Sequence, residues 1–404
     1  MTTPQAHAHH YVPRWYQKRF LKAGQNEYHY LDLRPETIVC NGKKYTMRAL
    51  RWCGPARCFC EEHLYTVRLG NWSTDNIERK FFGAIDSAGR NGVEIFSEYH
   101  DICEGLGDAY QSLVDYMDAQ RVRTPRGLDL LKKSVDISDQ SQTLLAMRKL
   151  YRWHTTMWME GVWEIARARQ SQTKFIVCDE PVTFFNRRGF PSEFPYPTDI
   201  GLEQTGTRTL FPLGLDSCLI ITHLQLVRDP WADPLIPRVN ARSYQFTMKH
   251  LGDIQFGREL EEDEVLRINY ILKRRATRYI AAAEESWLYP EERLSSASWS
   301  KLDHDWFLLP NLYKVPFTTG MLIGKRNGPA WAMDEYGRNP GNPKYEDKAL
   351  REKERITTER GKREWARVRA GKSVAHVGRF EHDEVYDKIM LEDQAGQSRE
   401  GGAR

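Results

Sequence analysis

The chain has 404 residues, of which 40% are hydrophobic and 28% charged, and its formal net charge is +4 at pH 7. This hydrophobic fraction suffices for a folded core, so the composition excludes a wholly disordered chain. The small net charge is no nucleic-acid signature by itself, and no stretch approaches the roughly 20 apolar residues of a membrane-spanning helix. Because the start of the chain also lacks an apolar signal segment, the sequence predicts a soluble, cytoplasmic protein with no membrane partner.

The seven cysteines are odd in number and unevenly spaced, which is not typical of a secreted disulfide scaffold. Three of them lie close to a histidine, in the run Cys53, Cys58, Cys60 and His63. Three thiolates and an imidazole can bind zinc, but this spacing lacks the usual paired C-x2-C units. The sequence therefore favours small buried thiols over structural Zn²⁺ at these four residues.

Periodicity and turn residues predict a series of short elements. Pro13 fits the first turn of a helix, and two strands, 27–33 and 37–40, are expected to pair as a small antiparallel sheet. A helix start at 73–75 places Glu78 in the first turns of the helix. The remaining expected elements are helices at 106–120, 128–170 and 261–283 and strands at 174–178, 207–213 and 217–222.

The sequence changes character after about residue 320. Residues 324–344 are rich in Gly, Pro and Asn and read as a linker, and the chain beyond them is mixed in charge and poor in apolar residues. We therefore expect a core domain over 1–320, and a linker with a partly disordered or helical tail over 321–404. Helix-rich segments around a short mixed or antiparallel sheet predict an α+β core with a polar C-terminal tail.

The opening motif His9-His10-Tyr11-Val12-Pro13-Arg14-x-Tyr16-x-x-x-Phe20 resembles the start of a mostly bacterial family of unknown function, which is defined by its His-His-Tyr-Val-Pro motif. Further marks of that family follow in order over roughly residues 7–290. They are Tyr65, Glu78, Gln120-x-x-Arg123-Thr124-Pro125, Phe175-Ile-Val-Cys-Asp179-x-Pro181, Pro212-Leu213 and Asn269.

Two positions depart from the family pattern. Cys178 precedes Asp179 where the family usually has a small or hydroxyl residue, and Gly214 follows Pro-Leu where the family often has serine or threonine. The resemblance implies the extent of the fold and the importance of the motifs. It supplies no activity, because the family has none firmly attached.

The motif residues themselves suggest phosphate chemistry. Glu78 and Asp179 are expected to hold Mg²⁺ or Mn²⁺, Arg123 to neutralise phosphoryl oxygens and His10 to activate water. Adjacent side chains diverge on a strand, so His9 and His10 are not expected to bind one ion together. The assignment is catalytic for His9, His10, Arg123 and Asp179, substrate-binding for Tyr11, Arg14 and Gln120, and metal-binding for Glu78 and Asp179.

The leading hypothesis is a metal-dependent phosphodiester hydrolase, such as a stress or defence nuclease with nucleic acid as its partner. The basic run Lys273-Arg274-Arg275-x-x-Arg278 could face backbone phosphates, although a solvated helix face explains it as well. The alternative is a non-catalytic binding or regulatory module in which Arg123 pairs with a nearby carboxylate and Asp179 forms a turn. A metal-free enzyme on a small substrate is a third hypothesis, without a recognised phosphate loop or nucleophile motif.

Overall fold

The computed structural model describes residues 8–40, 43–69, 72–101, 103–137, 139–150, 152–238, 251–315, 321–325, 328–334, 336 and 338–378. The helices are α1 (Arg14–Gln17), α2 (Gly83–Ser97), α3 (Leu106–Arg123), α4 (Pro125–Val135), α5 (Gln140–Leu150), α6 (Thr155–Met159), α7 (Leu224–Arg228), α8 (Glu262–Arg275) and α9 (Lys348–Val368). The strands are β1 (Ala8–His10), β2 (Tyr28–Asp32), β3 (Thr37–Cys40), β4 (Lys43–Thr46), β5 (Leu50–Cys53), β6 (Cys60–Glu62), β7 (Val67–Leu69), β8 (Trp72–Thr74), β9 (Val162–Arg167), β10 (Val177–Cys178), β11 (Thr183–Phe185), β12 (Arg208–Pro212), β13 (Ser217–Thr222), β14 (Gln255–Glu259), β15 (Tyr279–Ala282), β16 (Met321–Lys325), β17 (Gly328–Met333) and β18 (His376–Val377).

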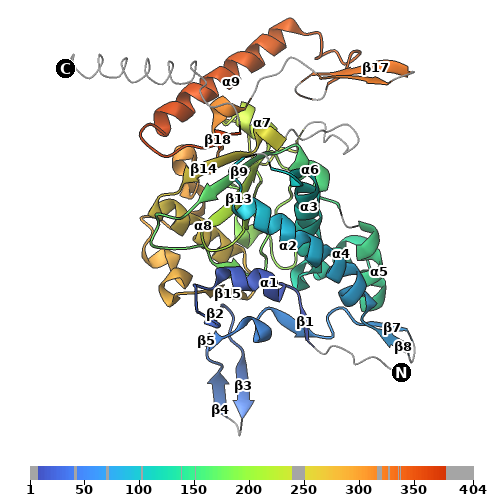
Figure 1. The fold of residues 1–404 in the computed structure, drawn as a ribbon, viewed down its shortest axis with the longest axis vertical. Helices are drawn as coiled ribbons and strands as arrows, with labels where there is room; N and C mark the ends of the chain where they lie inside the picture. The colour runs from blue at the N-terminus through green and yellow to red at the C-terminus, as the bar shows by residue number, and fades with distance from the viewer. Residues whose placement is uncertain are drawn as a thin grey trace, which may run out of the picture.

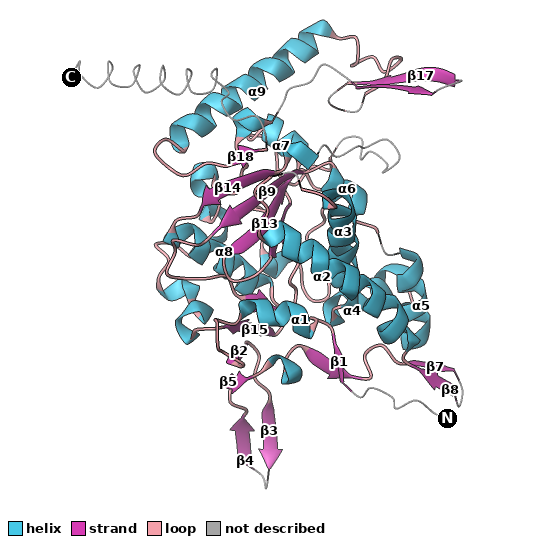
Figure 2. Cartoon of the chain, viewed as in Figure 1, coloured by secondary structure: helices cyan, strands magenta, loops and turns pink. Residues whose placement is uncertain are grey.

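A six-stranded sheet in the order β11-β12-β13-β9-β14-β18 forms the centre of the fold. Its strands pair antiparallel except β14 and β9, which are parallel. Every residue of β9 and β13 is buried, as expected for strands covered on both faces. Figure 2 shows these strands with α8 to one side and the α2–α3 pair to the other. The architecture confirms the expected α+β class with a mixed sheet.

A second, antiparallel sheet has the order β10-β15-β2-β5. The predicted pairing of 27–33 with 37–40 is therefore wrong. β2 pairs with β5 and with β15, which comes from the other end of the core, whereas β3 pairs only with β4 within the described residues. The β3–β4 hairpin projects from the molecule at the foot of Figure 1. β15 lies far from β2 along the chain, so no local sequence pattern indicated that these two strands pair.

Two long helical predictions are wrong in part. Within 128–170, residues Val162–Arg167 form β9 at the middle of the sheet. Periodicity alone does not separate a buried strand from a buried helix, and the tryptophans there fit either. The helix expected over 261–283 ends at Arg275, because Ala276 turns to an extended ψ of 139° and Tyr279–Ala282 pairs as β15. Strands β12 and β13 lie where the sequence placed them.

Much of the predicted tail packs on the core. Trp365 and Ala366 of α9 are buried in a small apolar cluster with Leu226 and Val227 of α7, and Figure 1 shows α9 lying across the top of the fold. The predicted linker overlaps the β16–β17 hairpin, and the end of the tail, 379–404, lies outside the described residues. None of the helices in the described part combines the length and apolar character that crossing a membrane requires.

Candidate functional site

His9 is fully buried at the first strand of the described chain. Its ring stacks on Tyr65 with centroids 5.5 Å apart, and its Nδ1 accepts the backbone N–H of Tyr65 at 2.8 Å. The Nε2 atom lies 3.7 Å from Oδ1 of Asp75. Because Nδ1 acts as an acceptor, the ring hydrogen of the neutral form is assigned to Nε2, on the side of Asp75. The contacts of His9 with Tyr65 thus connect β1 to the segment that follows β6.

His10 points to different neighbours, as alternation along a strand requires. It is half-buried, and burial lowers the pKa of its imidazole below the ordinary 6.5, although backbone hydrogen bonding to Ala56 and Pro55 acts in the opposite direction. Its imidazole is therefore mostly neutral at pH 7. A neutral imidazole keeps one nitrogen able to accept a proton.

Gln120 and Arg123 form the centre of a buried polar network. The Gln120 amide donates to the carbonyl of Tyr11 at 2.7 Å, and its oxygen accepts from Nε and Nη2 of Arg123 at 2.9 and 2.6 Å. The remaining guanidinium nitrogen donates to Asp86 at 2.9 Å. Arg123 is 1% exposed and lies over the ring of Phe82. This network joins the opening motif to α3 and α2.

Glu78 borders the same network, on the turn Ile77–Phe82 that leads into α2. Its Oε2 atom is buried and has no hydrogen-bond partner among the described residues. Burial raises the pKa of Glu78 to about 7; Arg123 opposes this rise, whereas Asp86 and Asp75 add to it. Glu78 is therefore a carboxyl group that exchanges a proton near neutral pH, which is a property of acid–base catalysts.

Asp179 lies outside the network of Gln120 and Arg123 and binds backbone groups. Its two carboxylate oxygens accept the backbone N–H groups of Thr277, Arg278 and Tyr279 at 2.9, 2.6 and 2.8 Å. Thr277 and Arg278 lie between α8 and β15, and Tyr279 is the first residue of β15, so Asp179 fixes the chain just after the helix ends. Among the described residues, Asp179 makes no hydrogen bond or ion pair with Arg123 or Glu78.

The other two predicted substrate-binding residues differ in exposure. Tyr11 is 3% exposed and packs edge-on against Phe59, whereas Arg14 is exposed on α1. The structure therefore unites His9, Glu78, Gln120 and Arg123 around α2 and α3, with the carbonyl of Tyr11 accepting from Gln120. His10, Arg14 and Asp179 lie outside that network.

The described residues contain no group of three or more His, Cys, Asp or Glu side chains arranged to hold a metal ion. This holds both for the Glu78 and Asp179 pair with the two histidines and for the cysteine-rich run. The expectation of Mg²⁺ or Mn²⁺ thus has no ready-made ligand group in this part of the chain.

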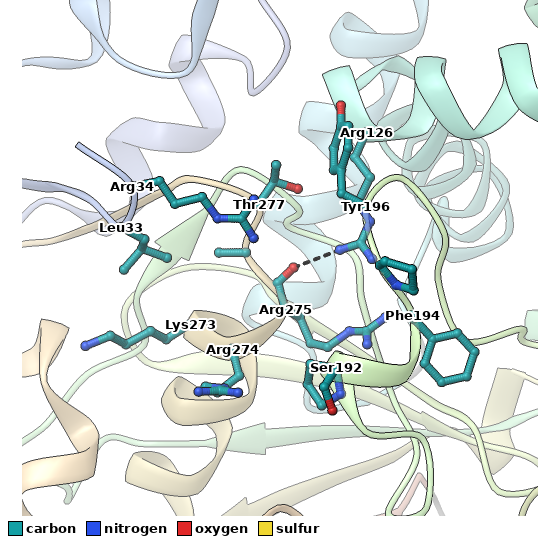
Figure 3. A pocket seen from close by; sticks show the side chains of 13 residues that line it. Leu33, Arg34, Arg126, Ser192, Phe194, Tyr196, Lys273, Arg274, Arg275 and Thr277 are labelled. Carbon is teal, nitrogen blue, oxygen red and sulfur yellow. Dashed lines mark hydrogen bonds between the residues drawn. The ribbon is translucent and has the colours of Figure 1, made fainter. Parts of the chain in front are cut away.

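A pocket of about 450 Å³ lies where the C-terminal end of α8 meets the loop after η4 (Pro191–Glu193) and the turn after β2. Figure 3 shows how these three segments surround it. None of the described residues that line it is acidic. The lining residues are Leu33, Arg34, Arg126, Pro191, Ser192, Phe194, Pro195, Tyr196, Lys273, Arg274, Arg275, Ala276 and Thr277.

The positive charge of this pocket is incompletely neutralised. Arg126 is 8% exposed and donates to the backbone carbonyls of Pro197, Thr198 and Arg275. Burial, together with the like charges of Arg126 and Arg121, lowers the pKa of Arg275 to about 9. Arg34 is exposed and makes no ion pair with the described residues. An anion entering the pocket would relieve this crowding.

Of the segments that line the pocket, the sequence indicated only the basic run on α8 as a phosphate-binding candidate. Arg34, Arg126 and the aromatic pair Phe194 and Tyr196 come from segments far apart in the sequence. No local pattern marks them, since only the tertiary fold brings them to the end of α8.

Comparisons with known proteins returned nothing: no family model, no curated protein and no solved structure matches the chain. The resemblance to the His-His-Tyr-Val-Pro family therefore stays a prediction.

Proposed function

We propose that the protein binds a phosphate ester, either a nucleotide or the end of a nucleic-acid strand, in the pocket at the end of α8. The observation that carries this proposal is the lining itself: five basic side chains and two aromatic rings, with no acidic side chain among the described lining residues. Planar guanidinium groups match the geometry of phosphate oxygens, so an arginine-rich pocket favours phosphate over a compact monovalent anion.

The five basic side chains differ in how far the protein already neutralises or holds them. Lys273 pairs with Glu291 and Arg275 with Asp199, so both are partly neutralised by the protein. Arg34 and Arg274 are exposed and form no ion pair with described residues, so they are the side chains most available to a ligand. Arg126 is held by three carbonyls and offers a fixed positive charge at the wall.

The apolar part of the lining supports an aromatic base. Phe194 and Tyr196 lie on the same loop at the pocket, and the phenol of Tyr196 donates to Asp129 at 2.7 Å, which orients its ring. Stacking on such rings is tolerant of sequence and contributes about 1–3 kcal/mol per base. The volume of about 450 Å³ lies in the range of small-ligand pockets.

Fluorescence anisotropy tests the proposal. Labelled single-stranded DNA and RNA oligonucleotides are titrated with the wild-type chain and with Arg34→Ala and Arg274→Ala. Each variant is expected to weaken binding about tenfold at moderate salt and to reduce the slope of log K against log salt by about one. Lys133→Ala, which removes an exposed charge on α4 away from the pocket lining, is the matched control and should bind like wild type.

Competition identifies the ligand. Displacement by a mononucleotide supports a nucleotide pocket, whereas displacement only by longer oligonucleotides supports a strand-end site. Equal displacement by inorganic phosphate, or equal weakening by Lys133→Ala, contradicts a built phosphate-ester site.

Phosphodiester hydrolysis is a second candidate, and the specific observation that favours it is Glu78. Its buried oxygen lacks a hydrogen-bond partner among the described residues, and its pKa of about 7 suits proton transfer at neutral pH. His9 and Arg123 lie in the network around it. This candidate keeps the nuclease hypothesis, with Glu78 in place of Asp179 as the central carboxylate.

Cleavage of mixed RNA and DNA in Mg²⁺ or Mn²⁺ tests this candidate. Glu78→Gln is expected to lower the rate at least about 100-fold, while Glu104→Gln, at an exposed position, leaves it unchanged. Absence of cleavage by the wild-type chain, or equal cleavage by Glu78→Gln, contradicts hydrolysis. A Mn²⁺-dependent rise in melting temperature that Asp179→Asn abolishes would restore Asp179 as a metal ligand.

A further inference from the structure

Two thiols meet where β5 ends. Cys53 is the last residue of β5, and Cys58 follows the short turn Pro55–Arg57. Their Sγ atoms are 3.1 Å apart, and both thiols are free. A disulfide bond needs the sulfur atoms at about 2.05 Å, so about 1 Å of movement would join them.

The surrounding backbone holds the two thiols together. The Sγ of Cys58 lies 3.3 Å from the carbonyl of Gly54, and that carbonyl also accepts the N–H of Arg57 at 3.0 Å. Pairing of Tyr28 with Cys53 fixes the other side of the loop in the second sheet. A β-carbon at Gly54 would lie 2.9 Å from the carbonyl oxygen of Asn26, so the loop sits tightly against its neighbour.

The two cysteines differ in access and in acidity. Cys58 is fully buried, while Cys53 retains 8% exposure. Hydrogen bonding with Cys58 lowers the pKa of Cys53 to about 7, with Arg51 and Arg57 assisting. The same pairing, together with burial, raises the pKa of Cys58. Cys53, the more accessible of the two sulfurs, is therefore partly ionised near pH 7.

We infer that Cys53 and Cys58 are a peroxide-sensitive dithiol that closes to an intramolecular disulfide. The thiolate of Cys53 attacks one oxygen of hydrogen peroxide; the O–O bond breaks, and the departing hydroxide takes a proton to leave as water. This gives a sulfenic acid at Cys53. The sulfur of Cys58 then displaces the hydroxyl group from Cys53, and that group leaves as a second water with the proton of Cys58. Two thiols are oxidised and one peroxide is reduced.

Neighbouring groups favour this pair over other partners. Burial raises the pKa of the Cys60 thiol, so Cys60 is the weaker nucleophile. Together with Cys60 and His63 the pair forms no metal-binding group among the described residues. The geometry therefore points to a redox function for these cysteines, for which the sequence alone favoured inert buried thiols.

Mass spectrometry of the full chain tests the inference. After brief treatment with stoichiometric peroxide, the denatured protein is expected to lose two of its seven titratable thiols and about 2 Da of mass. Trypsin cleaves after Arg51, Arg57 and Arg68. An unreduced digest should therefore contain peptide 52–57 linked to peptide 58–68, and reduction should separate them.

Variants assign the bond. Cys60→Ser should keep the linked peptides, Cys58→Ser should abolish them, and Cys40→Ser, at an exposed cysteine, should leave the reaction unchanged. Alkylation of Cys53 by iodoacetamide is measured against pH as an independent readout, with a midpoint expected near 7 in the wild-type chain. Unlinked peptides in the oxidised wild-type protein, a bond to Cys60, or stoichiometric zinc protecting these thiols would overturn the inference.

Discussion

A buried carboxylate is stabilised when hydrogen-bond donors surround it, and Asp179 and Glu78 differ in this respect. Asp179 accepts three backbone N–H groups and so serves as a fixed anchor between β10 and the end of α8. Glu78 has a buried oxygen without a hydrogen-bond partner among the described residues. Since a neutral carboxyl is easier to bury than a charged one, Glu78 holds its proton more tightly in the folded state.

This environment predicts a pH-dependent effect of Glu78→Gln. The folded pKa of about 7 exceeds the ordinary 4.5, so stability is highest with Glu78 protonated and falls as the pH rises from 4.5 through 7. Glutamine mimics the protonated form. The variant should therefore be more stable than wild type by about 2 kcal/mol at pH 8 and nearly equal to it at pH 4.5.

Urea unfolding at both pH values measures this difference, with Glu104→Gln as the exposed control. A variant that is less stable than wild type at pH 8 would show that the attraction between Glu78 and Arg123 outweighs the cost of burial.

Part of this site could be predicted from the sequence, because some of its residues belong to short local motifs. His9, Gln120 and Arg123 stand in motifs, and hydrogen bonds then unite them through Tyr65 and Tyr11. The role of Asp179 depends on donors almost 100 residues away in the chain, which no motif reveals. Arg34 and Arg126 reach the basic pocket for the same tertiary reason.

At the level of elements, α2 and α3 pack closely through two glycines on α2. A β-carbon at Gly89 would lie 2.6 Å from the Tyr116 side chain, and one at Gly92 would lie 2.8 Å from the carbonyl oxygen of Ala109. The second contact is with backbone, which cannot turn aside. This close approach helps to hold Arg123 of α3 within reach of Asp86 on α2.

Gly92→Ala is expected to destabilise the protein by about 1–3 kcal/mol, because the steric conflict exceeds the better helix propensity of alanine. Gly107→Ala on α3 is the matched control. Nothing lies within 4 Å of its added carbon, so it should be neutral or stabilising by about 0.5 kcal/mol. Urea unfolding followed by circular dichroism compares the two. Equal effects would mean that α2 shifts freely over α3.

A helix or strand could be predicted where the sequence carries a clear local signal, such as a cap or a proline. Thr124 caps α4 by accepting the N–H of Gly127, and Pro125 begins that helix at a position that suits proline. Strand β9 gave no such signal, because buried strands and buried helices are equally apolar. The end of α8 was missed since Asp179, a distant residue, stabilises the turn after it.

At the scale of the whole molecule, the charged C-terminal region completes the core. β18 pairs with β14 at the edge of the central sheet. Arg369, after α9, pairs with Glu264 of α8 at 2.5 Å, and both are at most 2% exposed. Composition predicted a polar tail that is partly disordered or helical. Composition is an average over many residues, so it does not show that burial in α9 is concentrated at a few residues near the end of the helix.

Trp365 tests whether α9 is integral to the fold. It is 1% exposed among residues of α7 and the segment around Leu312, so Trp365→Ala should destabilise the protein by about 3–5 kcal/mol. Ile356→Ala, on the same helix but 55% exposed, should stay within about 0.5 kcal/mol of wild type. Urea unfolding monitored by far-ultraviolet circular dichroism avoids the lost fluorescence of the tryptophan. Equal stabilities of the two variants would mean that α9 rests on the core without stabilising it.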